Sequence, residues 1–230
     1  MMEEENSQAQ PQEERQDLLD AQELRVLAVL AEKEALTPDA YPMSLNALTN
    51  GCNQLSSRDP VMSLNEDEVQ QTLDRLMQEK FVTEVRQAGA RVAKYEHRLR
   101  IKWLLEQDKL AVLTVLMLRG AQTAGEIRTR SGRLHEFSSI TEVESCLQFL
   151  MDKYPPLVAR LPRAPGTKEA RYTHLLSGDV EQVQEAAVEA GTVGVSRNDR
   201  IAQLEAEVTT LREEVAELKE QFRQFREQFE

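Results

Sequence analysis

Leucine spacing divides the chain into two similar parts. Leucines recur at three-residue steps in two segments, at Leu24, Leu27 and Leu30 and again at Leu110, Leu113 and Leu116. This spacing predicts an amphipathic helix in each segment. Two later segments, EVQQTLDRLMQEK and EVESCLQFLMDK, share Glu, Val, Leu, Leu, Met and Lys in the same order. Because the matching segments lie about 75 to 85 residues apart, the pattern predicts a duplicated unit.

Helix-start signals support the same division. In each of these signals a capping residue is followed three positions later by Glu, which satisfies free backbone N–H groups at a helix N-terminus. The pairs are Asp20 with Glu23, Asn65 with Glu68, Thr123 with Glu126, and Ser139 with Glu142. Each unit is therefore predicted to contain a long first helix, a short second helix over 44–53 or 124–131, and a third helix.

β-prone segments follow each predicted third helix. They cover 81–87 and 92–97 in the first unit, and 157–161 and 170–175 in the second, with Gly or Pro in the turn between them. Three helices followed by a β-hairpin is the winged-helix order. The sequence thus predicts a mainly α protein with small β-hairpins (α+β), built as two tandem winged-helix domains plus a C-terminal coiled-coil helix.

The coiled coil is predicted from a sustained period of 3.5 residues near the C-terminus. Its apolar positions are Ile201, Leu204, Val208, Leu211, Val215, Leu218, Phe222, Phe225 and Phe229. β-Branched residues at a and leucines at d favour a parallel two-stranded coiled coil and hence a homodimer. The alternative is one amphipathic helix that folds back onto its own domain. The predicted domain limits are 1–18 for a disordered acidic tail, 19–104 and 105–178 for the winged helices, 179–197 for a linker and 198–230 for the coiled coil.

The net charge of −12 is concentrated at the two ends of the chain. Residues 1–20 carry seven acidic residues and one basic residue, and 179–230 carry thirteen acidic and six basic residues. The middle of the chain has 20 acidic and 21 basic residues, so its net charge does not exclude nucleic acid as a partner.

Two long strings make the chain similar to a known family. EKEALTPDAYPMSLNALTNGCNQLSSRDPVMSLNEDEV and LRGAQTAGEIRTRSGRLHEFSSITEVES closely resemble the YceH family of bacterial tandem winged-helix proteins of unknown function. The resemblance covers roughly residues 18–178 and implies the fold. It implies no activity, so function is argued from the residues.

A winged helix usually reads DNA with its third helix, but here both third helices are predicted to present acidic residues outward. Those carboxylates would repel phosphates. Basic residues instead occur on the two hairpins and on or just after the short second helix of the second unit, at Arg86, Arg91, Lys94, Arg128, Arg130, Arg133, Arg163 and Lys168. They are candidate phosphate contacts. The alternative is that they only solubilise exposed strands or pair with neighbouring acids.

The segment 44–58 is the best candidate for a polar recognition surface. Its hydrogen-bonding side chains include Asn46, Asn50, Asn53, Gln54 and Arg58, with little competing acid. Asn and Gln can bind adenine edges, and Arg can hold phosphates. The alternative is that these side chains cap the short helix and the turn after it.

No motif argues for catalysis, and no metal or cofactor is expected. His97, His135 and His174 are far apart in the sequence, and Cys52 and Cys146 fit neither a disulfide scaffold nor a zinc site. Apolar runs are too short to span a membrane, and the polar N-terminus has no secretion signal. We therefore expect a cytoplasmic, non-enzymatic, dimeric protein that binds duplex DNA as a regulator or accessory factor. The alternative is an adaptor whose winged helices bind a protein partner without binding DNA.

Overall fold

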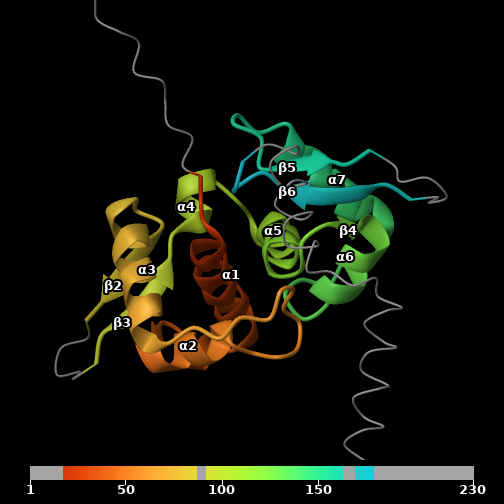
Figure 1. The fold of residues 1–230 in the computed structure, drawn as a ribbon. Helices are drawn as coiled ribbons and strands as arrows, with labels where there is room; N and C mark the ends of the chain where they lie inside the picture. Colours follow the sequence, from red (N-terminus) through yellow and green to blue (C-terminus); the bar gives the residue numbers. More distant parts are fainter. Residues whose placement is uncertain (1–17, 87–91, 163–168, 179–230) are drawn as a thin grey trace, which may run out of the picture. The chain divides into compact units, whose positions relative to one another are not determined.

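The computed structural model describes residues 18–86, 92–162 and 169–178 of the 230-residue chain. Residues 1–17 of the predicted tail, the predicted linker over 179–197 and the predicted coiled coil over 198–230 lie outside the described residues. The described part is mainly helical with small antiparallel sheets, as the α+β prediction required (Figure 1).

The first half of the described chain contains the predicted three helices, with additional short elements. Its elements are α1 (Ala21–Leu36), the 3-10 helix η1 (Pro38–Ala40), β1 (Met43–Ser44), α2 (Leu45–Cys52), α3 (Glu66–Gln78), β2 (Val82–Val85), β3 (Lys94–His97) and α4 (Leu99–Trp103). The sequence pattern did not predict η1, β1 or α4. Asp20 and Asn65 cap α1 and α3 as predicted, each in a reciprocal capping box with the Glu three residues later.

The second half repeats this order without η1 and α4. Its elements are α5 (Gln107–Arg119), β4 (Gln122–Thr123), α6 (Ala124–Ser131), α7 (Ile140–Met151), β5 (Val158–Arg160) and β6 (Arg171–His174). Thr123 forms the predicted capping box with Glu126. Ser139 caps α7, but the Glu142 carboxylate accepts hydrogen bonds from Ser138 instead of closing the box. Three of the four predicted boxes are therefore confirmed in full.

Each half contains a three-stranded antiparallel sheet, with strand order β1-β3-β2 in the first half and β4-β6-β5 in the second. The predicted hairpin strands pair in both halves, for example Val82 with His97 and Val158 with His174. The third strand of each sheet has only two residues and directly precedes the short helix of its half. It therefore fixes where that helix starts relative to the hairpin.

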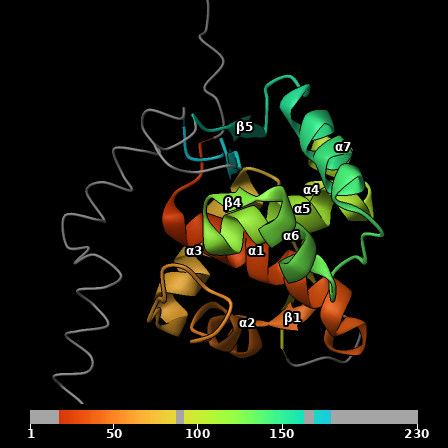
Figure 2. The same ribbon diagram turned by 90° about the vertical axis from the view of Figure 1, so that its right-hand side faces the viewer.

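The two long first helices pack against each other at the centre of the described body. α1 packs more extensively on α5 than on any other element, and Figure 2 shows both among the other helices. Residues Leu110–Leu118 of α5 and Glu23–Glu32 of α1 are all buried. The prediction of one-sided amphipathic helices was wrong here, because each helix is covered by its own half on one side and by its counterpart on the other.

No helix among the residues that the structure describes is both long enough and apolar enough to cross a membrane.

Candidate nucleic-acid interface

The side chains of Asn53 and Gln54 make hydrogen bonds within the fold. The Asn53 side-chain amide donates to the Leu64 carbonyl, and the Leu64 N–H donates back to Asn53 Oδ1, both at 2.7 Å. Gln54 Oε1 accepts from the Arg58 guanidinium at 2.9 Å. These contacts fix the turn after α2, so Asn53 and Gln54 take the structural role that the sequence left open as the alternative.

Arg58 is buried, which removes it from the candidate phosphate contacts. Its side chain is fully inaccessible and donates to both carboxylate oxygens of Glu32, at 3.1 and 2.7 Å, and to the Gly51 carbonyl. Burial of Glu32 opposes ionisation, but hydrogen bonds from Arg58 and its charge outweigh it and lower the pKa of the carboxyl. The pair is therefore charged at neutral pH and joins α1 to the connection between α2 and α3.

Asn46 and Asn50 are exposed but lie beside acidic residues. Asn46 donates to Glu66 Oε1 at 2.9 Å and accepts from Asn50 at 3.2 Å. Glu66 begins the acidic exposed face of α3, which also carries Asp67 and Asp74. A phosphate backbone approaching this face of α3 would meet carboxylates, so this face is a poor surface for nucleic acid.

Within the residues that the structure describes, the first hairpin has little unpaired, exposed positive charge. Arg86 is 80% exposed and forms an ion pair with Glu84 two residues earlier. Lys94 is half-buried on β3, opposite Val85. Arg91 lies outside the described residues, as do Arg163 and Lys168 on the second hairpin.

The second half presents exposed arginines on α6 and the turn that follows it. Arg128 donates to the carbonyls of Phe137 and Ser138, at 3.2 and 3.0 Å, which anchors it over the α6–α7 connection. Arg130 is exposed and lies 3.6 Å from Glu126, and Arg133 is exposed just after α6. Of the sequence-predicted phosphate contacts, these three are brought together by one short helix and its turn.

Arg119, at the end of α5, is a basic residue that the sequence analysis missed. It is half-buried, and its side chain makes no hydrogen bond or ion pair with any part of the chain that the structure describes. The signal in the sequence was weak, because Arg119 looks like an ordinary basic residue in the last turn of a helix.

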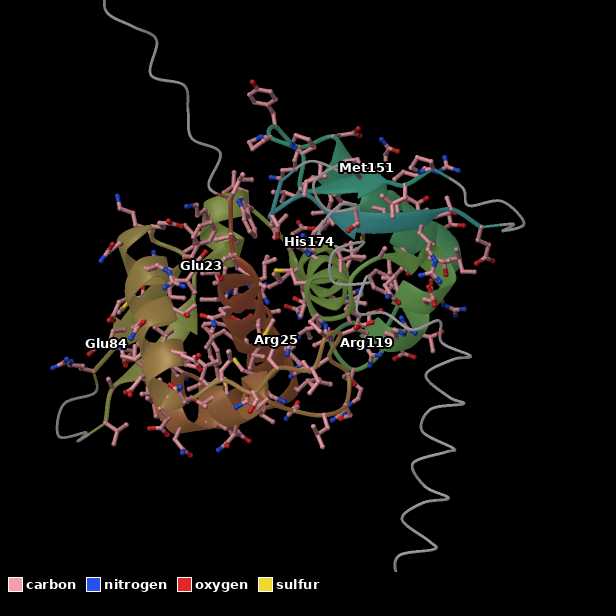
Figure 3. All side chains as sticks on the ribbon, in the orientation of Figure 1. Glu23, Arg25, Glu84, Arg119, Met151 and His174 are labelled. Carbon is pink, nitrogen blue, oxygen red and sulfur yellow. The ribbon has the colours of Figure 1, made fainter. Side chains whose placement is uncertain are left out.

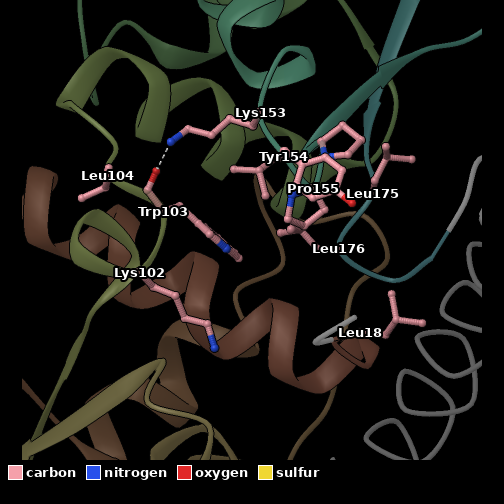
Figure 4. Close-up of a pocket in the computed structure, with 11 residues that line it drawn as sticks. Leu18, Lys102, Trp103, Leu104, Lys153, Tyr154, Pro155, Leu175 and Leu176 are labelled. Carbon is pink, nitrogen blue, oxygen red and sulfur yellow. Dashed lines mark hydrogen bonds between the residues drawn. The ribbon is translucent and has the colours of Figure 1, made fainter. Parts of the chain in front are cut away.

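An apolar groove of about 400 Å³ lies away from these arginines (Figure 4). Trp103 and Leu104 at the end of α4 line it, together with Tyr154 in the connection after α7, which is 96% exposed. Lys153 donates to the Trp103 carbonyl across the groove. The other lining residues include Leu18, Leu175 and Leu176. Exposed apolar surface of this kind is typical of protein contact sites.

Cys146, His97 and His174 are buried. The Cys146 thiol donates to Asp108 at 3.4 Å, while burial and the Asp108 charge raise its pKa to about 12. His97 Nε2 lies 3.2 Å from the Glu34 carboxylate. Burial lowers the pKa of His174 to about 4. Within the described ranges, no group of three or more His, Cys, Asp or Glu side chains is placed to hold a metal ion.

Together these features define a mainly helical α+β protein with two similarly ordered halves, a basic face on α6 and a separate apolar groove. A family model described as a protein of unknown function, DUF480, matches residues 19–167. The chain is 70% identical over 210 residues to the UPF0502 protein HEAR1280 of Herminiimonas arsenicoxydans, an alignment that covers 90% of this chain and 89% of that relative.

Other relatives agree with this assignment. A UPF0502 protein of Janthinobacterium sp. (strain Marseille) is 73% identical over 197 residues, covering 86% of this chain and 85% of its own. One from Shewanella sp. (strain MR-7) is 46% identical over 197 residues, covering 82% and 89%. The chain therefore belongs to the UPF0502 (DUF480) family of YceH-like bacterial proteins, and the family resemblance expected from the sequence is confirmed.

Proposed function

We propose that each half is a winged-helix domain and that the protein is a non-enzymatic regulator or accessory factor that binds duplex DNA through its second half. The observation that carries this proposal is the group of exposed arginines Arg128, Arg130 and Arg133. Guanidinium groups bind phosphate oxygens through paired hydrogen bonds. Neutralising the phosphates releases counterions from the DNA, and this release drives association.

In this proposal α6 contacts backbone phosphates, and α7 does not read the bases. The outward residues of α7 include Glu142 and Glu144, and its C-cap residue is Asp152; all three are exposed. Carboxylates at these positions would lie within a Debye length of the phosphates, about 8 Å at physiological salt. We therefore expect binding that is mainly electrostatic and only weakly dependent on DNA sequence.

A salt titration with a short labelled DNA duplex tests the proposal. Replacing Arg128, Arg130 and Arg133 by Gln removes three phosphate contacts, so the slope of log affinity against log salt should decrease in magnitude by about 2.7. A control variant with the same change in charge replaces Arg75, Lys80 and Lys102 of the first half by Gln. Absence of binding by the wild type at low salt, or equal slopes for the two triple variants, contradicts the proposal.

The apolar groove favours a second candidate, an adaptor that binds a protein partner without DNA. Trp103, Leu104 and Tyr154 offer the aromatic and aliphatic surface typical of binding hot spots. A pull-down of the native protein with and without nuclease separates the two functions. A partner that survives nuclease treatment and is lost in Tyr154→Asp supports the adaptor, whereas recovery that depends on nucleic acid supports DNA binding.

A further inference from the structure

The connection between α2 and α3 crosses from the first half to the end of α5. The Asp59 N–H donates to the Leu118 carbonyl at 2.8 Å, which places residues 58–59 beside 118–119. We call this junction the seam. Arg58 lies on the first-half side of the seam, and Arg119 is the last residue of α5. Arg130 lies on α6, which packs against α5, and its charge acts on Arg119.

Positive charge exceeds negative charge at the seam. Its basic residues are Arg25, Arg58, Arg119 and Arg130, with Lys33 and Arg171 paired to the acids Glu32 and Glu126, and its remaining acid is Asp59. Burial, followed by the charges of Arg130 and Arg58, lowers the pKa of Arg119 from its usual value. Arg130 and Arg58 therefore oppose the charge of Arg119, while Glu32 and Asp59 favour it.

The buried arginines differ in how they are satisfied. Glu32 neutralises Arg58 directly, as described above. Arg25, on α1, is 2% exposed and donates to the carbonyls of Cys52 and Pro60, while its Nε has no hydrogen-bond partner in the described structure. Carbonyl groups accept hydrogen bonds but carry no net charge, so the charge of Arg25 adds to the positive field at the seam. Figure 3 labels Arg25 and Arg119 on the two central helices.

We propose that the seam is a phosphate-binding site in which Arg119 and Arg130 hold one backbone phosphate of duplex DNA. This inference rests on the proposed function and adds that the duplex contacts the junction of the two halves as well as α6. Arg119 suits this role because it is half-buried and has no described side-chain partner. It therefore pays less entropy on ordering than a fully exposed arginine and exchanges no existing ion pair for the phosphate.

The test compares Arg119→Gln with Lys80→Gln, which removes the same charge from the exposed turn after α3. Each variant is titrated with salt against the duplex that the wild type binds. Arg119→Gln should reduce the salt slope by about 0.9, so that raising salt from about 50 to 200 mM weakens its binding about 3.5-fold less than that of the wild type. Lys80→Gln should keep the wild-type slope.

Arg119→Lys separates charge from folding, because it should retain the wild-type slope even if Arg119→Gln fails to fold. A wild type that binds the duplex, together with an unchanged slope in Arg119→Gln, overturns the seam site and leaves the proposed function standing. A loss of slope in Arg119→Lys equal to that in Arg119→Gln also overturns it, because the charge would then not be what binds. A wild type that does not bind at low salt overturns the proposed function itself.

A competition experiment separates a duplex from a free phosphate ligand. Inorganic pyrophosphate at matched phosphate concentration should compete only weakly with the duplex for the protein. Equal competition overturns the assignment to a duplex in favour of a free phosphate ligand.

Discussion

The buried pair of Arg58 and Glu32 allows a quantitative test of how the first half is stabilised. Glu32→Gln keeps the size of the side chain and removes its charge. The Arg58 side chain has no solvent exposure and that of Glu32 has 10%, so water does not replace the lost partner. Gly51 and Gln54 still accept hydrogen bonds from Arg58, but neither carries a compensating charge. Breaking such a pair from one side leaves an uncompensated buried charge.

We expect the substitution to lower the free energy of unfolding by about 3 kcal/mol, the lower end for a buried pair broken from one side. For a folded body of this size, that loss corresponds to a decrease in Tm of roughly 6 to 12 °C. Urea denaturation measures the free energy directly. The control is Glu106→Gln, because Glu106 contacts Lys109 at 2.7 Å but its side chain is 81% exposed. The control should cost less than about 1 kcal/mol.

The same substitution should change the pH dependence of stability. The pKa of Glu32 is lowered in the folded protein, from an ordinary value of 4.5. Its stabilising contribution is therefore fully present above about pH 4.5 and is lost as pH falls through the lower folded-state pKa. The difference between wild type and variant should be largest near neutral pH and narrow in acid. A cost below about 1 kcal/mol at pH 7, or a difference that widens in acid, refutes the reasoning.

Three further predictions concern packing, a buried histidine and assembly. Gly51→Ala should cost about 1 to 3 kcal/mol in urea denaturation, because its Cβ would lie 2.6 Å from Val29 Cγ1, whereas Gly125→Ala, with its nearest contact at 3.9 Å, should cost nothing or stabilise slightly. Burial lowers the pKa of His174 to about 4 from 6.5, so the wild type should lose stability as pH falls between these values, and His174→Phe should flatten this dependence. Sedimentation should show a full-length dimer that becomes monomeric in Leu211→Asp, a position of the predicted coiled coil outside the described residues; a monomeric wild type contradicts the dimer.

One outcome for each would contradict the predictions for Gly51 and His174. Equal costs for the two glycine substitutions would mean that the close approach of α1 and α2 relaxes without strain. A His174→Phe variant with the acid sensitivity of the wild type would assign that sensitivity to other groups.

Much of the local structure was determined by the sequence alone. The capping residues Asp20, Asn65 and Thr123 act on backbone groups three residues away, so their pattern specified helix starts that the structure confirms. The apolar and β-prone periods likewise specified the helices and the paired strands, because these signals depend only on near neighbours in the chain. The duplication was also visible, since each copy carries its own caps and leucines.

Tertiary structure decided what each polar side chain does. Arg58 and its partner Glu32 are 26 residues apart, so composition alone made Arg58 look like a phosphate contact, whereas folding buried it. The two-residue strand β1 was invisible to periodicity because it exists only by pairing with β3. The burial of α1 and α5 on all sides arose because the two copies share one core. Arg119 became a candidate site residue for the same reason: its surroundings come from both halves of the fold, and only packing brings them together.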